Sequence, residues 1–394
     1  MTDRLYYTDP YSREFDATVI RAESRDGRTF VVLDRTAFYP TSGGQPFDTG
    51  TLGAARVVDV VDDDDGNVVH VVEGDLAAGE TVHGAIDWTR RFDHMQQHTG
   101  QHVLSAAFDR LFGARTVSFH LGAAASTIDI GLELSPRDLA AAEDDANRIV
   151  WEDRPVHIRF ATAEEAAALP LRKETGRVGQ LRLIEVHDFD LSACGGTHVS
   201  RTGAIGVIAL GSWERFKGGQ RVEFLCGGRA LARFRSLRDT VASAMRLLSV
   251  GADEVPASVE RLQAEAKEQR RALSAIQIDL ARYKGEELAA AAEPTAKGRL
   301  VLEALDLDAN GLKGLAAAVA GKPGCAAVLV STSAPRLIVV ARAEDSPVQA
   351  NQVLAALTKQ FGGRGGGKPE MAQGGGLAGS PEDVLAAARA VILG

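Results

Sequence analysis

Two short runs of donor residues constrain this 394-residue chain most strongly. The first run is His98-Thr-Gly-Gln-His102, and the second is Cys194-Gly-Gly-Thr-His198. Each run places two metal-binding side chains four positions apart. Three imidazoles and one thiolate make a ligand set that suits a tetrahedral zinc ion. The two runs therefore predict a zinc site built from segments that lie far apart in the sequence.

The surroundings of the first run leave open which histidines bind the metal. His94, His98 and His102 recur every four residues, so they would form one stripe on the helix that we expect over residues 88–112. A zinc ion can bridge two imidazoles at this spacing, so only two of the three need be ligands. The run is not the HExxH signature of zinc proteases, because no Glu follows the first histidine.

The second run is expected to be a loop. Two adjacent glycines make a helix through Cys194 and His198 costly, and they let the backbone close around an ion. Two other interpretations stay open. Cys194 could be a buried structural cysteine beside a surface histidine, or all four ligands could form a closed zinc site that has no catalytic role.

The first half of the chain predicts strands with two long helices. Residues 1–90 are β-rich, because short segments of Val, Ile and Phe are separated by turn residues. The acidic cluster at 62–67 is expected at a hairpin tip. Residues 113–231 mix strands with a second helix, for which Ser135 is the expected N-cap.

A helical segment over residues 257–291 carries a heptad pattern, flanked by Pro256 and Pro294. The pattern favours a self-associating or spacer helix, although folding back on the preceding helix also fits it. The seam consists of Val259, Leu262, Ala266, the polar Gln269, Leu273, Ile276, Leu280 and Tyr283.

Residues 295–394 predict a compact α/β domain with a glycine-rich loop at 362–376. The loop satisfies the GxxxxGK pattern up to Lys368, but Pro369 stands where a Ser or Thr would bind Mg²⁺, and the loop follows a helix. We therefore reject an ATP-binding role and expect backbone N–H groups and two cations that can contact RNA phosphates. The other expected elements are strands at 326–333 and 336–343 and helices at 346–361 and 381–393.

Composition limits the setting of the protein. The net charge is −9, yet residues 201–250 hold nine Lys or Arg against three acidic residues, which fits either a solvated helix face or a phosphate-contacting strip. Three cysteines argue against a disulfide framework. No secretory signal is visible, and no apolar stretch reaches the roughly 20 residues of a membrane helix. We expect a cytoplasmic protein with no membrane partner.

A glycine-containing loop at 38–48 lies between two expected strands. Its glycines permit close approach of the backbone to a ligand, and Gln45 offers both an amide donor and an acceptor. An ordinary glycine-rich turn would explain the same residues.

Together, these motifs resemble a known family. His98-Thr-Gly-Gln-His102, Cys194-Gly-Gly-Thr-His198 and Ser42-Gly-Gly-Gln45 resemble the editing domain of alanyl-tRNA synthetase, and more closely the long form of the free-standing AlaX alanyl-tRNA editing proteins. The stretch 362–376 is similar to the glycine-rich signature of the DHH-associated C-terminal domain. The resemblance covers essentially the whole chain. It implies an α+β fold with a small β-barrel at 1–90, a zinc-binding editing domain at 91–231, a helical coiled-coil spacer at 232–294 and an α/β domain at 295–394.

The resemblance also implies the roles of individual residues. It makes His98, His102, Cys194 and His198 the ligands of one zinc ion per chain and leaves His94 out. It assigns the substrate pocket to Gln45, Asp48, Thr99 and Ser118, and tRNA binding to Arg364, Gly365, Gly366, Gly367 and Lys368.

The implied activity is hydrolysis of serine or glycine from mischarged tRNA(Ala), with the acceptor end and body of that tRNA as partner. The zinc ion could activate a water molecule or polarise the ester, or it could mainly hold the amino acid. Because the chain starts at the β domain and lacks the Asp-His-His motif of the related phosphoesterases, we expect editing without aminoacylation or phosphodiesterase activity. The alternatives are a non-catalytic, zinc-stabilised tRNA-binding protein and a zinc hydrolase of a small acylated substrate. A homodimer would fit the helical seam.

Overall fold

The computed structural model describes residues 1–173 and 179–394. The chain forms two compact units, Met1–Ser243 and Ala244–Gly394, which are described separately. The first two predicted segments lie in the first unit and the last lies in the second. The predicted spacer 232–294 is divided between them, because the unit boundary falls within one of its helices.

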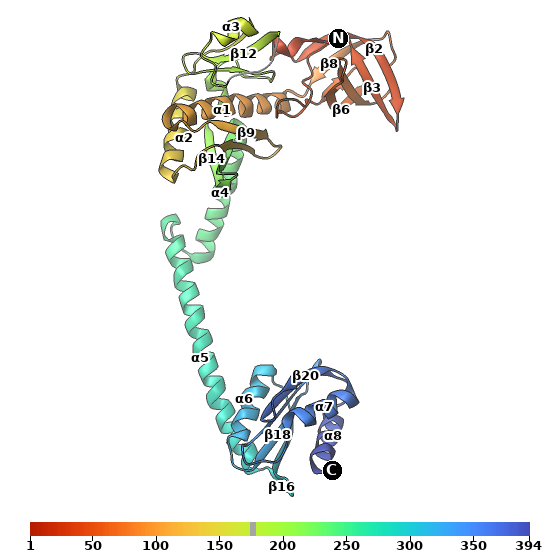
Figure 1. Cartoon of the computed structure of the whole chain (residues 1–394), viewed down its shortest axis with the longest axis vertical. Helices are drawn as coiled ribbons and strands as arrows, with labels where there is room; N and C mark the ends of the chain where they lie inside the picture. Colours follow the sequence, from red (N-terminus) through yellow and green to blue (C-terminus); the bar gives the residue numbers. More distant parts are fainter. Residues whose placement is uncertain (174–178) are drawn as a thin grey trace. The chain divides into compact units, whose positions relative to one another are not determined.

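The N-terminal part is a closed barrel of six strands, in the order β2-β3-β7-β6-β5-β8, which confirms the predicted small barrel (Figure 1). Alternate residues point inward, so Phe15, Ala17 and Val19 of β2 are buried in its core. The acidic cluster forms the expected turn between β6 and β7. The strands are β2 Glu14–Arg25, β3 Arg28–Leu33, β5 Gly50–Leu52, β6 Ala55–Asp62, β7 Val68–Glu73 and β8 Thr81–Ile86, beside the short pair β1 Asp3–Arg4 and β4 Arg35–Thr36.

Helix α1, Trp88–Phe112, is the central element of the first unit and matches its predicted bounds. The side chain of Asp87 accepts a hydrogen bond from the backbone of Arg90 at its start, and Gly113 ends it in a left-handed conformation with φ 64°. Met95, Val103 and related residues bury one part of its surface in the main core of the unit. The helix is buried over most of its length, so the polar residues of the first run also lie inside the protein.

Two small sheets and two further helices complete the region around α1. Helix α2 begins at the predicted N-cap, where Ser135 and Asp138 form a capping box. The sheet orders are β14-β15-β10-β9 and β11-β12-β13. The bounds are α2 Pro136–Trp151, α3 Ala163–Ala167, β9 Thr116–Leu121, β10 Ser126–Ile130, β11 Val156–Thr162, β12 Gln180–Val186, β13 Asp190–Ala193, β14 Ile208–Phe216 and β15 Gly219–Cys226.

The second unit contains a six-stranded sheet with helices on both faces (Figure 1). Helix α6 covers one face and α7 and α8 cover the other, so the central strand β18 is buried on both sides. The predicted strands and helices of this domain are confirmed. The sheet order is β16-β17-β18-β19-β21-β20, with β16 Glu293–Thr295, β17 Gly298–Leu305, β18 Cys325–Ser331, β19 Arg336–Arg342, β20 Arg364–Gly367, β21 Met371–Leu377, α6 Ala309–Ala320, α7 Ala350–Phe361 and α8 Pro381–Leu393.

The predicted glycine-rich loop is wrong as a description of residues 362–376. These residues form an antiparallel hairpin of β20 and β21, in which Gly365 lies opposite Gly374. A Cβ atom at Gly365 or Gly367 would overlap the backbone of β21, so the close approach of the two strands requires glycine there. Glycine normally signals a break in regular structure, which explains the error.

The predicted helix at 257–291 is confirmed as α5 Val255–Ala290, and a further helix, α4 Gly227–Leu248, precedes it. The C-terminal end of α5 packs on α6, where Gly285 lies so close to Ala318 that a Cβ atom would overlap it. None of the described helices is long and apolar enough to cross a membrane.

A buried histidine in the barrel makes the fold sensitive to acid. His70 is fully buried, and its Nδ1–H donates to the carbonyl of Val31 at 3.1 Å while Nε2 accepts from the Thr36 hydroxyl at 2.8 Å. Burial lowers the pKa of His70 from 6.5 to about 4, although the Val31 hydrogen bond raises it. His70 therefore binds a proton below about pH 6.5 in the unfolded chain, but only near pH 4 in the folded barrel.

We expect His70 to lower the free energy of unfolding by about 2–3 kcal/mol as the pH falls from 7 to 4.5, and to have no such effect above pH 7. Urea unfolding, followed by circular dichroism, gives the free energy of unfolding of the wild-type chain and of His70→Gln at both pH values. Between these pH values, the free energy of unfolding should fall more for the wild type than for the variant. Equal pH dependence in the two proteins would contradict the assignment.

Candidate metal centre

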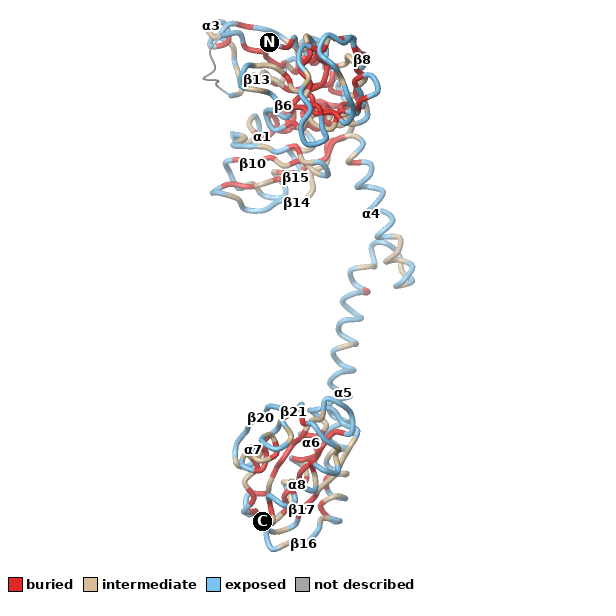
Figure 2. The backbone as a smooth tube through the Cα atoms, turned by 90° about the vertical axis from the view of Figure 1, so that its right-hand side faces the viewer, coloured by how far each residue is buried: buried red, intermediate tan, exposed pale blue. Residues whose placement is uncertain are grey.

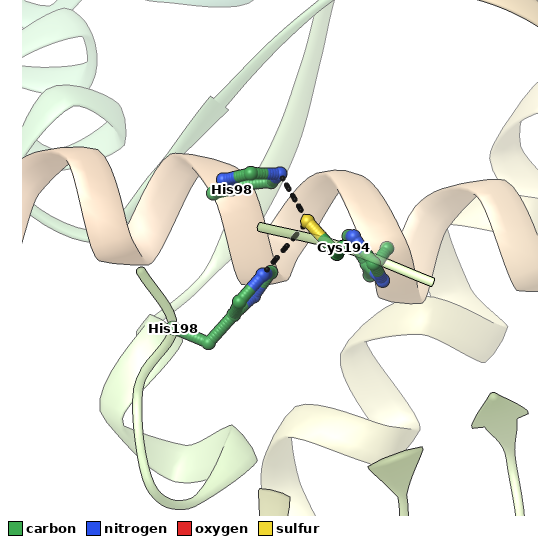
Figure 3. A group of neighbouring side chains, drawn as sticks. His98, Cys194 and His198 are labelled. Atoms are coloured by element: carbon green, nitrogen blue, oxygen red, sulfur yellow. Dashed lines mark hydrogen bonds between the residues drawn. The ribbon is translucent and has the colours of Figure 1, made fainter. Parts of the chain in front are cut away.

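The structure brings the four predicted metal ligands together. Helix α1 presents His98 and His102 from one face, and the loop after β13 presents Cys194 and His198. The ligand atoms of all four lie within 4.8 Å of one another. Figure 3 shows the imidazoles of His98 and His198 directed at the Cys194 sulfur. The second run is a loop, as its two glycines predicted.

The spacing of the donor atoms fits a tetrahedral zinc ion. The Sγ atom of Cys194 lies 3.3 Å from Nε2 of His98 and 3.3 Å from Nε2 of His198. Zn–N and Zn–S bonds of about 2.0–2.3 Å would place tetrahedral ligand atoms roughly 3.3–3.6 Å apart. Three neutral imidazoles and a thiolate are also the ligand chemistry that zinc prefers. The residues present therefore fit this metal.

Each histidine is held in the orientation that leaves Nε2 free for a metal. The Nδ1–H group of His98 donates to Gln45 Oε1 at 2.8 Å, and that of His102 donates to Asp190 Oδ2 at 3.1 Å. An acceptor at Nδ1 fixes the proton there and directs the Nε2 lone pair to the metal.

The third histidine uses a threonine of the first run. His198 Nδ1 lies 3.2 Å from Thr99 Oγ1. The Thr99 hydroxyl donates its own proton to the Met95 carbonyl at 2.9 Å, so its oxygen is left to accept from His198. The resemblance had predicted Thr99 as a pocket residue; the structure places it against His198, one of the ligands.

Gln45 is a buried link between three segments. Its Oε1 atom accepts from His98 and, at 3.1 Å, from the backbone N–H of Thr197. Its Nε2 atom donates to the Thr197 hydroxyl at 2.8 Å. Both ends of the amide are thus used within the protein, and Gln45 is fully buried. The loop at 38–48 positions a metal ligand in addition to forming a turn.

Asp190 is a site residue that the sequence analysis missed. Arg172 Nε donates to its Oδ1 at 2.6 Å, and the Ser192 hydroxyl lies 3.0 Å from its Oδ2. Burial raises the pKa of Asp190, but His102 and Arg172 outweigh it and bring the pKa to about 2. Burial lowers the pKa of His102, but Asp190 and Cys194 outweigh it and raise the pKa to about 9. No spacing rule in the sequence connects Asp190 to His102.

Arg182 is a second missed residue and lies beneath the Cys194 loop. Its Nη1 donates to the carbonyls of Cys194 and Gly196, each at 2.8 Å, and its Nε donates to the Tyr7 carbonyl at 2.9 Å. These bonds fix the loop at both carbonyls that flank its first glycine.

The neighbouring histidines favour the thiolate form of Cys194. Burial would raise the pKa of the Cys194 thiol, but His98 and His198 hold that pKa well below its usual range.

Two glycines of the motifs are required by close packing. A Cβ atom at Gly100 would overlap the sulfur of the buried Cys226, so α1 can approach β15 only through glycine. A Cβ atom at Gly196 would overlap the imidazole of His98. Gly195 differs, because the nearest atom to its Cβ position is the Tyr7 hydroxyl at 3.8 Å.

The structure does not bring every predicted pocket residue to the cluster. Asp48 is fully buried and forms an ion pair with Arg91. Ser118 donates to Asp129 at 2.5 Å, whereas the next residue, Phe119, lies with its ring centroid 5.8 Å from that of His98. Successive residues of a strand face opposite sides, which explains the difference.

His94 lies outside the ligand set, as the family pattern implied. It is buried, and its Nδ1 has no hydrogen-bond partner among the described residues. Burial lowers the pKa of His94 to about 4.

The basic stretch 201–250 is partly neutralised by carboxylates, most of which lie elsewhere in the sequence. The ion pairs are Arg201–Asp153, Arg215–Glu133, Arg221–Asp129, Arg229–Asp93 and Arg238–Asp239.

Comparison with known proteins agrees with this arrangement. Residues 10–90 match tRNA synthetases class II (A), residues 181–223 match the threonyl and alanyl tRNA synthetase second additional domain, and residues 297–393 match the DHHA1 domain. The alanyl-tRNA editing protein AlaX-L of Pyrococcus horikoshii is 30% identical over 389 residues, covering 95% of this chain and 94% of that protein.

Longer relatives match over the same part of the chain. The alanine–tRNA ligase of Pyrococcus abyssi is 34% identical over 391 residues, which cover 95% of this chain but only 42% of the ligase. The crystal structure of the C-Ala domain from Aquifex aeolicus alanyl-tRNA synthetase matches 26% of this chain and 98% of that chain, with a TM-score of 0.25 and 20% identity.

The barrel, the four-donor centre and the DHHA1 domain define a protein built from domains that also occur in an alanine–tRNA ligase. The chain belongs to the AlaX-L family of alanyl-tRNA editing proteins.

The two loop glycines should respond differently to substitution. We expect Gly196→Ala to displace His98 and to weaken zinc binding by about tenfold or more, whereas Gly195→Ala should bind zinc as the wild type does. Competition with a chelator, with zinc measured by mass spectrometry after dialysis, gives the affinity of each variant. Equal zinc affinity in both variants would show that the close packing at Gly196 does not position the ligand.

Proposed function

We propose that this chain hydrolyses the ester bond that joins serine or glycine to the 3′ end of tRNA(Ala). The observation that carries the proposal is the cluster of His98, His102, Cys194 and His198, with each histidine oriented by its own acceptor, in a chain of the AlaX-L family. Acceptors at Nδ1 accompany metal-ligating histidines in general, so they support a bound metal, and membership of the AlaX-L family supports an editing reaction at it.

The chemical reason for such an activity lies in the amino acids themselves. Glycine is smaller than alanine, and serine adds only a hydroxyl group, so a pocket for alanine rejects both poorly. A second site that hydrolyses the wrong product corrects the error.

Residues of the chain would bind the metal and keep its ligands in position. His98, His102, Cys194 and His198 would bind one zinc ion, which can polarise an ester carbonyl or lower the pKa of a bound water molecule, or can hold the amino acid. Gln45, Thr99 and Asp190 keep the three imidazoles in place. Arg182 fixes the carbonyls of Cys194 and Gly196 and so keeps the loop closed.

We also propose that the β20–β21 hairpin binds the body of the tRNA. Strand β20 is exposed along its whole length and lies at the edge of the sheet, with Arg364 and Lys368 at its two ends. A Cβ atom at Gly366 would meet nothing within 4 Å, unlike one at Gly365 or Gly367. Packing within the domain therefore does not require Gly366 to be glycine, whereas close approach of a phosphate to the backbone would.

Removal of the thiolate tests the activity. We expect Cys194→Ala to lose zinc and to hydrolyse Ser-tRNA(Ala) and Gly-tRNA(Ala) about 100-fold or more slowly. Cys325→Ala, which removes a buried thiol in the second unit, should keep both properties. Zinc content and single-turnover deacylation are measured on the same preparations.

The deacylation experiment also separates the alternatives. Full deacylation by a zinc-free Cys194→Ala protein would overturn the proposed centre. A wild-type protein that binds tRNA(Ala) but deacylates none of its aminoacyl forms would be a binding protein, and one that hydrolyses only small acyl esters would be a different hydrolase.

The hairpin is tested by two variants that should leave the fold intact. We expect Arg364→Ala/Lys368→Ala to weaken tRNA(Ala) binding and to reduce the slope of log K against log salt by about 1.5, the loss of two phosphate contacts. Gly366→Ala should weaken binding without changing the unfolding transition. Fluorescence anisotropy measures binding. Lys313→Ala/Lys359→Ala removes the same charge from the exposed faces of α6 and α7 and should have a smaller effect on the slope.

A further inference from the structure

The loop that carries Cys194 is open at one position. The three histidine ligands lie in the buried interior of the first unit, which Figure 2 shows in red, whereas Cys194 and Gly195 are partly exposed. Among the described residues, and apart from its chain neighbours, a Cβ atom at Gly195 would meet only the Tyr7 hydroxyl within 4 Å, at 3.8 Å. A substrate group can therefore approach the ligand loop at Gly195, where the Tyr7 hydroxyl is its first neighbour.

Arg182 holds the two sides of this opening together. Its Nε donates to the Tyr7 carbonyl at 2.9 Å, and its Nη1 donates to the carbonyls on either side of Gly195, each at 2.8 Å. Its guanidinium carbon lies 5.6 Å from the centroid of the Tyr7 ring, and the Tyr6 ring meets the same ring edge-on with the centroids 5.0 Å apart. These contacts fix both the ring and the loop, so the Tyr7 hydroxyl has a defined position beside Gly195.

The positive charge of Arg182 has no carboxylate partner among the described residues. The side chain is buried, and its Nη2 atom has no hydrogen-bond partner in the described part of the chain. Burial lowers the pKa of Arg182, and the groups that oppose this effect are the Cys194 thiol and three tyrosines. A zinc ion bound by one thiolate and three neutral imidazoles keeps a net positive charge, so it would not supply an anion. A buried cation without a counter-ion is costly, and an incoming anion would relieve that cost.

The Tyr7 hydroxyl is available to the same anion. The buried hydroxyls of Tyr6 and Tyr39 each form a hydrogen bond within the protein, whereas the Tyr7 hydroxyl forms none with the described residues. Tyrosine hydroxyls and guanidinium groups both bind phosphate oxygens. In an aminoacyl-tRNA, the last internucleotide phosphate belongs to the same nucleotide as the aminoacyl ester. An ester at the metal centre would therefore bring this phosphate to the surroundings of Gly195.

We propose that Tyr7 and Arg182 form a subsite for the last internucleotide phosphate of the RNA 3′ end. The Tyr7 hydroxyl donates a hydrogen bond to a phosphate oxygen, and Arg182 supplies the positive charge behind it. The subsite positions the terminal nucleotide so that its ester lies beside Cys194. The inference rests on the proposed function, because it requires an RNA end whose ester reaches the metal centre.

Removing one partner of this hydrogen bond at a time tests the subsite. We expect Tyr7→Phe to weaken binding of tRNA(Ala) without an amino acid by about tenfold, because a hydrogen bond to a charged group is lost. A tRNA(Ala) whose last internucleotide phosphate is replaced by an uncharged methylphosphonate should bind the wild type about tenfold or more weakly. Tyr7→Phe should bind this second tRNA within about twofold of the wild type, because the charged partner is already gone. Fluorescence anisotropy gives the four dissociation constants.

Two controls separate this contact from a loss of structure. Tyr7→Phe should keep the zinc content and the urea unfolding transition of the wild type, because its hydroxyl has no partner among the described residues. Tyr283→Phe removes an exposed hydroxyl from α5 and should bind both tRNAs as the wild type does. An equal loss of affinity for both tRNAs in Tyr7→Phe would overturn the contact between the hydroxyl and the phosphate.

The subsite and the proposed function can fail separately. Equal binding of the two tRNAs by the wild type would overturn the subsite even if Ser-tRNA(Ala) is deacylated. A protein that prefers the native phosphate through Tyr7 but deacylates no aminoacyl-tRNA would retain the subsite and overturn the proposed function. If Tyr7→Phe weakens inhibition by free serine and leaves the binding of both tRNAs unchanged, the pair binds a carboxylate, and the phosphate assignment is wrong.

Discussion

The hydrogen bonds of one buried amide connect three segments of the first unit at its candidate metal centre. Gln45 comes from the loop of the barrel, His98 from α1 and Thr197 from the loop after β13, and the Gln45 side chain bonds to both of the others. Burial of an amide that makes all of these hydrogen bonds costs little free energy of folding. Burial of an amide that lacks one of them would destabilise the folded state. The barrel, the helix and the ligand loop therefore depend on one another for their geometry.

The sequence predicted the cluster of His98, His102, Cys194 and His198 because two short runs carry it. Donors four residues apart on a helix share a face, which left His94, His98 and His102 as candidates, and the resemblance to the family then selected His98 and His102 beside Cys194 and His198. The residues that hydrogen-bond to these ligands and their loop could not be predicted in this way. Asp190 and Arg182 contact the cluster through the pairing of β12 with β13 and the approach of that sheet to α1, which no local pattern encodes.

The predictions of the fold show the same difference between local and long-range interactions. The barrel strands, the bounds of α1 and the buried strand β18 could be predicted because alternation, caps and apolar runs act over a few residues. The hairpin of β20 and β21 was missed because a glycine-rich composition normally indicates a loop. Here the glycines are required because the backbones of the two strands approach each other closely. Ser118 bonds to Asp129, whereas the ring of Phe119 lies beside His98, because the side of a strand that faces a site depends on register.

The edge of the six-stranded sheet carries a further consequence of that hairpin. Exposed sheet edges are where proteins pair wrongly with one another and begin to aggregate. Strand β20 consists of Arg364 and three glycines, so it offers no apolar side chain to an incoming strand, and Lys368 beyond it adds a second positive charge. Glycine also loses the most conformational freedom when it is fixed in a strand. The composition of this edge thus protects the protein from growth of the sheet by addition of further chains.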